Sequence, residues 1–201
     1  NMKRTGINLL GVNTDYLTID TPQYLDKTGN WFFEWSGMSD FFTFGNVSTY
    51  SNFSIYMDLS TGNFAFGSWR ANGKYLIWNT VQTSMQHYGN IKHNTYRLEH
   101  TPTRLKFFVN EILCYEEIIV DDYSHYIQYI GIVQSSINSA VYPNVSAKDQ
   151  FLTSLNYNGD VYVFDKIQNT NQIVGSLGNA LSIHTLEPTG NAYISNMLDY
   201  K

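Results

Sequence analysis

Hydrophobic and polar positions alternate most regularly between Asn94 and Ile119. Residues 95–100 alternate with a period of two, and the pattern breaks at Thr101-Pro102-Thr103. Alternation resumes through residues 104–109, which are followed by Asn110-Glu111 and a further β-rich run. Period-two alternation interrupted by short turn sequences is typical of antiparallel strands joined by hairpins. This stretch therefore predicts a three-stranded antiparallel meander.

The same alternation predicts strands along the rest of the chain, separated by turn residues every eight to twelve positions or so. Residues 134–148 and 82–94 are polar and predict loops. The segment 147–155 is the best helix candidate, although it fits a strand equally well. The remaining runs predict strands at 31–35, 53–59, 64–69, 74–80, 126–133, 151–157, 161–167, 172–177 and 192–198. We therefore predict an all-β antiparallel β-sandwich, formed as one domain by residues 1–201.

The order of strands and turns in 94–119 also resembles a known family. A strand that ends in Phe-x-Val-Asn before a two-residue turn is similar to the central hairpins of concanavalin A-like (laminin-G-like) jelly rolls. The chain departs from that pattern at Glu111, where glycine is usual. The resemblance covers about a third of the chain and implies a jelly-roll fold with a carbohydrate- or receptor-binding role.

The composition narrows the range of partners. The net charge is -5, charged residues make up 14% of the chain, and its lysines and arginines are scattered. A nucleic-acid-binding protein needs a basic face, so we expect no nucleic-acid partner. No apolar run reaches the length of a membrane span, so we expect no membrane insertion. Aromatic residues make up 16% of the chain, which favours strands and also supplies amphipathic rings for a binding surface.

Cysteine and histidine positions predict no cofactor. Cys114 is the single cysteine; it lies in a predicted strand and is expected to be a buried structural thiol. The histidine spacings match no metal-ligand pattern. A calcium ion is an alternative, because Asp121 and Asp122 supply the oxygen ligands that this ion prefers.

Acidic residues do not form a recognisable catalytic motif. Glu117 and Asp121 share a face if they lie on one strand, but four residues of strand separate their Cα atoms by about 13 Å. Catalytic carboxyl pairs lie about 5 to 9.5 Å apart. We therefore expect no catalytic residues, and a glycoside hydrolase remains an alternative in which Glu34, Asp58, Glu116 and Glu117 are the carboxylates to test.

Aromatic and amide side chains concentrate around one predicted hairpin and the loop after it. Flat rings pack on the C–H faces of sugars, while amide and guanidinium groups bond to sugar hydroxyls. Tryptophans in such strands are also common core residues. The predicted ligand-binding residues are Trp69, Arg70, Asn72, Tyr75, Trp78, His87, Tyr88 and Asn90.

Together these features predict a non-catalytic module that binds a glycan or a glycosylated cell-surface receptor. The family resemblance, and a start that carries no signal-peptide pattern, suit the head of a viral or phage receptor-binding protein. Such a head would be exposed on the virion, and similar heads are usually homo-oligomers, often trimers. The alternative is a structural virion decoration or adaptor domain that binds other protein chains.

Overall fold

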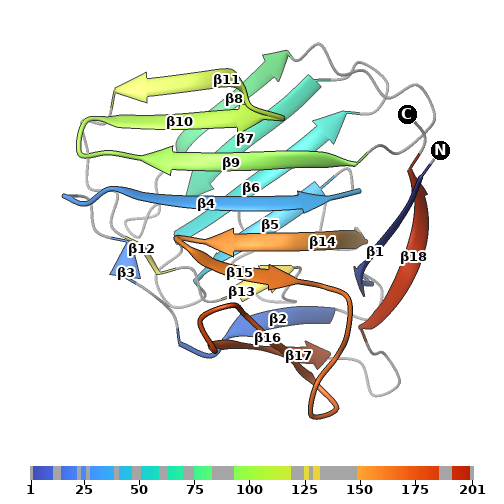
Figure 1. The fold of residues 1–201 in the computed structure, drawn as a ribbon. Coiled ribbons are helices and arrows are strands. Elements are labelled where there is room, and N and C mark those ends of the chain that lie inside the picture. Colours follow the sequence, from blue (N-terminus) through green and yellow to red (C-terminus); the bar gives the residue numbers. More distant parts are fainter. Residues whose placement is uncertain are drawn as a thin grey trace.

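Two antiparallel β-sheets face each other in the computed structural model of the chain. Figure 1 shows β9 to β11 of the first sheet in front of β6 to β8 of the second. The structure describes residues 2–10, 15–21, 24–25, 28–38, 41–46, 51–58, 63–69, 75–82, 93–118, 125–126, 129–131, 149–185 and 192–199. In β6, β7 and β8 the description covers the backbone.

The first sheet has the strand order β11-β10-β9-β4-β14-β1-β18, and β15 pairs with β14 beside this path. The predicted meander is confirmed, because β9, β10 and β11 are consecutive antiparallel neighbours. The strands are β1 (Met2–Leu9), β4 (Trp31–Gly37), β9 (Asn94–His100), β10 (Arg104–Val109), β11 (Ile112–Ile118), β14 (Gln150–Tyr157), β15 (Asp160–Val163) and β18 (Tyr193–Asp199).

The second sheet has the order β16-β17-β2-β13-β5-β6-β7-β8. A separate two-stranded sheet pairs β3 (Tyr24–Leu25) with β12 (His125–Tyr126). The strands of the second sheet are β2 (Asp15–Ile19), β5 (Phe41–Asn46), β6 (Ser51–Asp58), β7 (Asn63–Trp69), β8 (Tyr75–Gln82), β13 (Tyr129–Gly131), β16 (Gln172–Val174) and β17 (Ala180–Thr185).

The core lies between the sheets and is rich in aromatic rings. Alternate residues of β4 are buried, as their period of two predicts. Trp35 packs against Phe44 of the second sheet, with ring centroids 4.6 Å apart, and stacks on Tyr96 of β9 at 5.5 Å. Aromatic pairs at these separations add about 0.5–1.5 kcal/mol each beyond the burial of their area. The predicted all-β antiparallel sandwich is confirmed by this arrangement.

Several predicted elements differ from the structure. The run 126–133 contributes to two short strands in different sheets, β12 and β13, rather than to one. The segment 147–155 contributes to strand β14, so the helix alternative was wrong. Ala180–Thr185 forms β17, which the sequence analysis did not identify. Cys114 is half-buried rather than fully buried, and its partial burial raises the pKa of the thiol.

Candidate functional site

One row of cross-strand partners crosses all eight strands of the second sheet. Consecutive pairings join Tyr75 on β8, through each strand in turn, to Thr18 on β2 and Ser182 on β17. The full row is Tyr75, Trp69, Asn52, Gly45, Tyr129, Thr18, Ser182 and Gln172. Residues paired across strands occupy the same face of a sheet. Leu17, Ile19 and Leu181, which alternate with Thr18 and Ser182, are buried in the core, so the row lies on the face away from the core, here called the outer face.

Among the described side chains on the outer face, two aromatic rings stack on each other. Tyr16 on β2 and His184 on β17 are cross-strand partners. Their rings are 5.1 Å apart with an angle of 18° between their planes. His184 is exposed, Tyr16 is half-buried, and the glycine Gly131 is the partner of Tyr16 on its other side. The pair therefore offers a flat, partly accessible aromatic surface.

Hydroxyl and carboxylate groups adjoin this aromatic pair. Ser182 donates from its Oγ to Oδ2 of Asp20 at 2.7 Å. Thr18 Oγ1 lies 3.0 Å from Nε2 of His184 and 3.5 Å from Oδ1 of Asp20. These contacts connect four side chains from β2, its C-terminal end and β17 in one polar chain. The outer face thus combines a ring surface with fixed hydrogen-bonding groups.

The residues predicted from sequence fall only partly within the described chain. Trp69 and Tyr75 are backbone partners at the β7–β8 hairpin, and Trp78 is the partner of Gly67. Trp69 and Tyr75 therefore belong to the row that ends at Thr18, Ser182 and Gln172. Arg70, Asn72, His87, Tyr88 and Asn90 lie outside the described residues, and their part in a site stays a prediction.

The residues that the sequence analysis missed are Tyr16, Thr18, Asp20, Ser182 and His184. They lie on β2, at its end and on β17. Residues 180–185 do alternate, with Leu181 and Ile183 apolar and Ser182 and His184 polar, so the signal for this strand was present. The position of this strand beside β2 could not be predicted, because Thr18 and His184 are 166 positions apart in the sequence.

The outer face of the first sheet has a different chemistry, centred on Arg97. Its guanidinium donates to Glu99 at 2.8 Å, to Glu111 at 2.7 Å and to Glu34 at 3.4 Å. It also lies 4.4 Å over the ring of Phe108. Partial burial lowers the pKa of Arg97, but the hydrogen bonds to Glu111 and Glu99 outweigh this and raise the pKa overall. Arg97 is therefore a fixed cation whose donors are already engaged.

The carboxylates proposed for hydrolysis do not form an isolated pair within the described residues. Glu34 is bound to Arg97 on β4–β9, whereas Glu116 lies 3.6 Å from Arg104 on β10–β11. The side chains of Asp58 and Glu117 lie outside the description.

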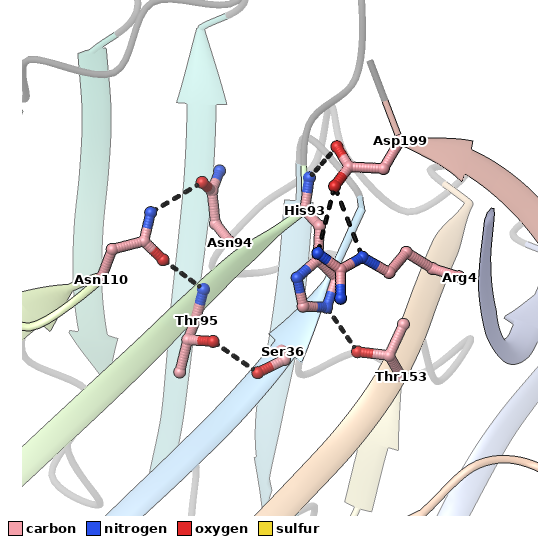
Figure 2. Close-up of polar contacts among 8 residues, drawn as sticks. All are labelled: Arg4, Ser36, His93, Asn94, Thr95, Asn110, Thr153 and Asp199. Carbon is pink, nitrogen blue, oxygen red and sulfur yellow. Dashed lines mark hydrogen bonds and ion pairs between the residues drawn. The ribbon is translucent and has the colours of Figure 1, made fainter. Parts of the chain in front are cut away.

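Within the first sheet, a partly buried polar network links β18 to β1 and to the residue before β9 (Figure 2). Asp199 on β18 accepts from the backbone N–H of His93 at 3.1 Å and from Nε and Nη2 of Arg4, each at 3.4 Å. The ring of His93 instead contacts Oγ1 of Thr153 at 2.7 Å.

Among the described residues, no group of three or more His, Cys, Asp or Glu side chains comes close enough together to hold a metal ion. Asp121 and Asp122, named for calcium, lie outside that part of the chain. His100 is buried, stacks on Trp31 at 4.5 Å and bonds to the carbonyl of Gly29 through Nδ1. The described segments also contain no helix of the length and hydropathy needed to cross a membrane.

Comparisons with known proteins gave matches among solved structures. No protein-family model matches the chain, and no curated protein matches it. One similar structure is the carbohydrate-binding module CBM66 from Bacillus subtilis, with 9% identity, a TM-score of 0.45, and coverage of 70% of this chain and 79% of that one.

Two further similar structures are a galectin and a glucanase. The Caenorhabditis elegans galectin LEC-6 has 9% identity and a TM-score of 0.39, covering 70% of this chain and 96% of that chain. The Bacillus licheniformis beta-glucanase has 12% identity and a TM-score of 0.43, covering 71% and 76%. Likeness at this level does not bear on ligand or activity.

Proposed function

We propose that this protein is a non-catalytic carbohydrate-binding module, with its ligand on the outer face of the second sheet. The observation that carries the proposal is the stacked Tyr16–His184 pair next to the hydrogen-bonded groups of Thr18, Asp20 and Ser182. A sugar has apolar C–H faces and polar hydroxyl edges. It therefore needs rings and hydrogen-bonding groups side by side, which this face provides.

The rigidity of the surface supports the proposal. The groups sit on paired strands rather than on loops, and Thr18 and Ser182 are direct cross-strand partners. Side chains held by a sheet lose little conformational freedom when a ligand binds, so more of the contact energy appears as affinity. The backbone row continues to Trp69 and Tyr75, and we propose that these two sequence-predicted residues contribute to the same surface.

The finer part of the proposal concerns the biological setting. We propose that the module is the head of a viral or phage receptor-binding protein, which displays this face to a glycan or a glycosylated receptor and assembles as a homo-oligomer. This part rests on the sequence resemblance and on low charge rather than on contacts. Light scattering on the purified chain tests the oligomeric state directly, and a trimer is the expected result.

The test of binding is a glycan array probed with the wild type and with matched aromatic variants. Tyr16→Ala and His184→Ala each remove half of the stacked pair, and each is expected to weaken binding at least about tenfold, since buried aromatic anchors contribute more than about 1.4 kcal/mol. Phe32→Ala removes a ring from the opposite sheet and should bind as the wild type does. A folded wild type that binds no glycan, or Tyr16→Ala and His184→Ala variants that bind normally, contradicts the proposal.

An adaptor role is the second candidate, favoured by a separate observation. The exposed aliphatic side chains of Val161 and Val163 on β15 lie near those of Val174 and Leu177, since Ser176 bonds to the backbone carbonyl of Val161. Exposed apolar patches mark protein interfaces. An array blank combined with self-association lost on Leu177→Ser would favour this role.

A further inference from the structure

The direction of each hydrogen bond on the outer face of the second sheet restricts what the face can bind. An ionised carboxylate only accepts hydrogen bonds, and a serine hydroxyl has one proton and two lone pairs. Ser182 gives its proton to Asp20 at 2.7 Å. Toward a ligand, Ser182 can therefore only accept. The remaining lone pairs of Asp20 also only accept.

The hydroxyl proton of Thr18 is also used in a hydrogen bond within the cluster. Its Oγ1 lies between Asp20 and Nε2 of His184, at 3.5 and 3.0 Å. If the hydroxyl proton points to Asp20, the imidazole N–H donates to Thr18; if it points to the imidazole, the ring nitrogen accepts it. In both arrangements the hydroxyl proton is used inside the cluster. Thr18 thus also presents only lone pairs to a ligand.

The charged group described on the outer face of the second sheet is negative. Asp20 is exposed beside the row of partners. Among the strand positions that the structure assigns to this face, none is lysine or arginine. The other sheet places Arg97, Arg104 and Lys106 on its own outer face. That face also carries Glu34, Glu99, Glu111 and Glu116, so it holds charges of both signs.

We infer that the outer face of the second sheet selects uncharged, hydroxyl-rich glycans and discriminates against glycans that carry carboxylate or sulfate groups. Sugar hydroxyls can donate to Asp20, Thr18 and Ser182. Carboxylates and sulfates are themselves acceptors, so at this cluster they would meet the lone pairs of Asp20, Thr18 and Ser182 and the negative charge of Asp20. The inference rests on the proposed carbohydrate-binding function and adds the class of glycan to it.

The experiment compares paired glycans, one charged and one neutral. The probes are sialylated and desialylated N-glycans, polygalacturonate and its methyl ester, and heparin and its desulfated, carboxyl-reduced form, each at low and high salt. The wild type is expected to prefer the neutral member of a bound pair by at least tenfold. Raising the salt should narrow the gap, because salt screens the repulsion by Asp20.

Asp20→Asn removes the charge and adds an amide donor at nearly constant size. We expect its preference for the neutral member to fall several-fold, while Asp165→Asn, the same change at another exposed aspartate, leaves the preference unchanged. Equal or tighter binding of the charged member by the wild type overturns the inference and leaves the proposed function standing. An unchanged preference in Asp20→Asn also overturns the inference and leaves the proposed function standing. A folded wild type that binds no probe and no array glycan overturns the proposed function itself.

Discussion

At the scale of single residues, two buried tyrosines couple the stability of the fold to alkaline pH. Burial raises the pKa of Tyr96 above 10.0, and burial followed by the hydrogen bond to Asp160 raises the pKa of Tyr162. A raised folded-state pKa means that the folded protein holds the proton more tightly than the unfolded chain does. The resulting stability is complete below the unfolded pKa of about 10 and is lost as the pH rises beyond it.

This coupling predicts a steep fall in the melting temperature between about pH 10 and pH 12, above the ordinary tyrosine pKa. Tyr96→Phe keeps the ring and removes the titrating hydroxyl, so its melting temperature should fall less steeply over this range. Tyr193→Phe changes an exposed tyrosine and should retain the wild-type slope. Thermal melts across the pH series measure the difference. Identical slopes for all three proteins would contradict the assignment of the alkaline loss of stability to the hydroxyl of Tyr96.

A second residue-scale feature is the conformation of the turn between β10 and β11. Asn110 has φ 48° and Glu111 has φ 67°, so both adopt the left-handed region that non-glycine residues rarely enter. Two positive φ values match the hairpin turn whose twist suits antiparallel strands. Glu111 stands where the family resemblance expects glycine, and its carboxylate reaches Arg97 at 2.7 Å.

Two substitutions at this turn separate backbone strain from the ion pair. Glu111→Ala loses the bond to Arg97 and keeps the strained φ, whereas Glu111→Gly loses the bond and relieves the strain. We expect the glycine variant to be more stable than the alanine variant by about 1 kcal/mol. Glu111 is 72% exposed, so its ion pair is worth less than about 1 kcal/mol. Urea unfolding of both variants measures this difference, and an alanine variant at least as stable as the glycine variant would rule out the strain.

At the scale of elements, the alternation in the sequence was sufficient wherever strands were long and joined by short turns. The 31–35 run and the 94–119 meander were predicted from it, and the hairpin at Asn158-Gly159 was predicted as well, although β15 ends at Val163 rather than reaching 167. Short strands paired with distant partners were not predictable, because propensity does not encode pairing. The alternation in residues 180–185 did indicate a strand, whereas the pairing that brings Ser182 and His184 beside β2 was not encoded in it. The candidate site could be assembled only once the register joined β17 to β2 and, further along the same row, Thr18 to Trp69.

At the scale of the whole molecule, the first and last described strands close the first sheet against each other. Residues 2–8 of β1 pair with 193–199 of β18 in continuous register, and Figure 1 shows the two strands curving together at one side of the sandwich. Pairing of segments so far apart in sequence requires the loss of much chain entropy before any contact is gained. Side-chain contacts that fix this pairing should therefore contribute strongly to stability.

Asp199 is the residue whose side chain fixes the pairing of β1 with β18. Its buried carboxylate holds Arg4 of β1 and the backbone of His93, next to β9, so one side chain joins three strands of the sheet. Asp199→Ala would leave the Arg4 guanidinium and the His93 N–H without this acceptor. We expect a loss of about 2–4 kcal/mol in the free energy of unfolding, with faster amide exchange concentrated in β1 and β18. Asp165→Ala, at an exposed aspartate, should change stability by less than about 0.5 kcal/mol. If Asp199→Ala unfolds at the same urea concentration as Asp165→Ala, the closure of the sheet depends on the backbone ladder alone and not on this carboxylate.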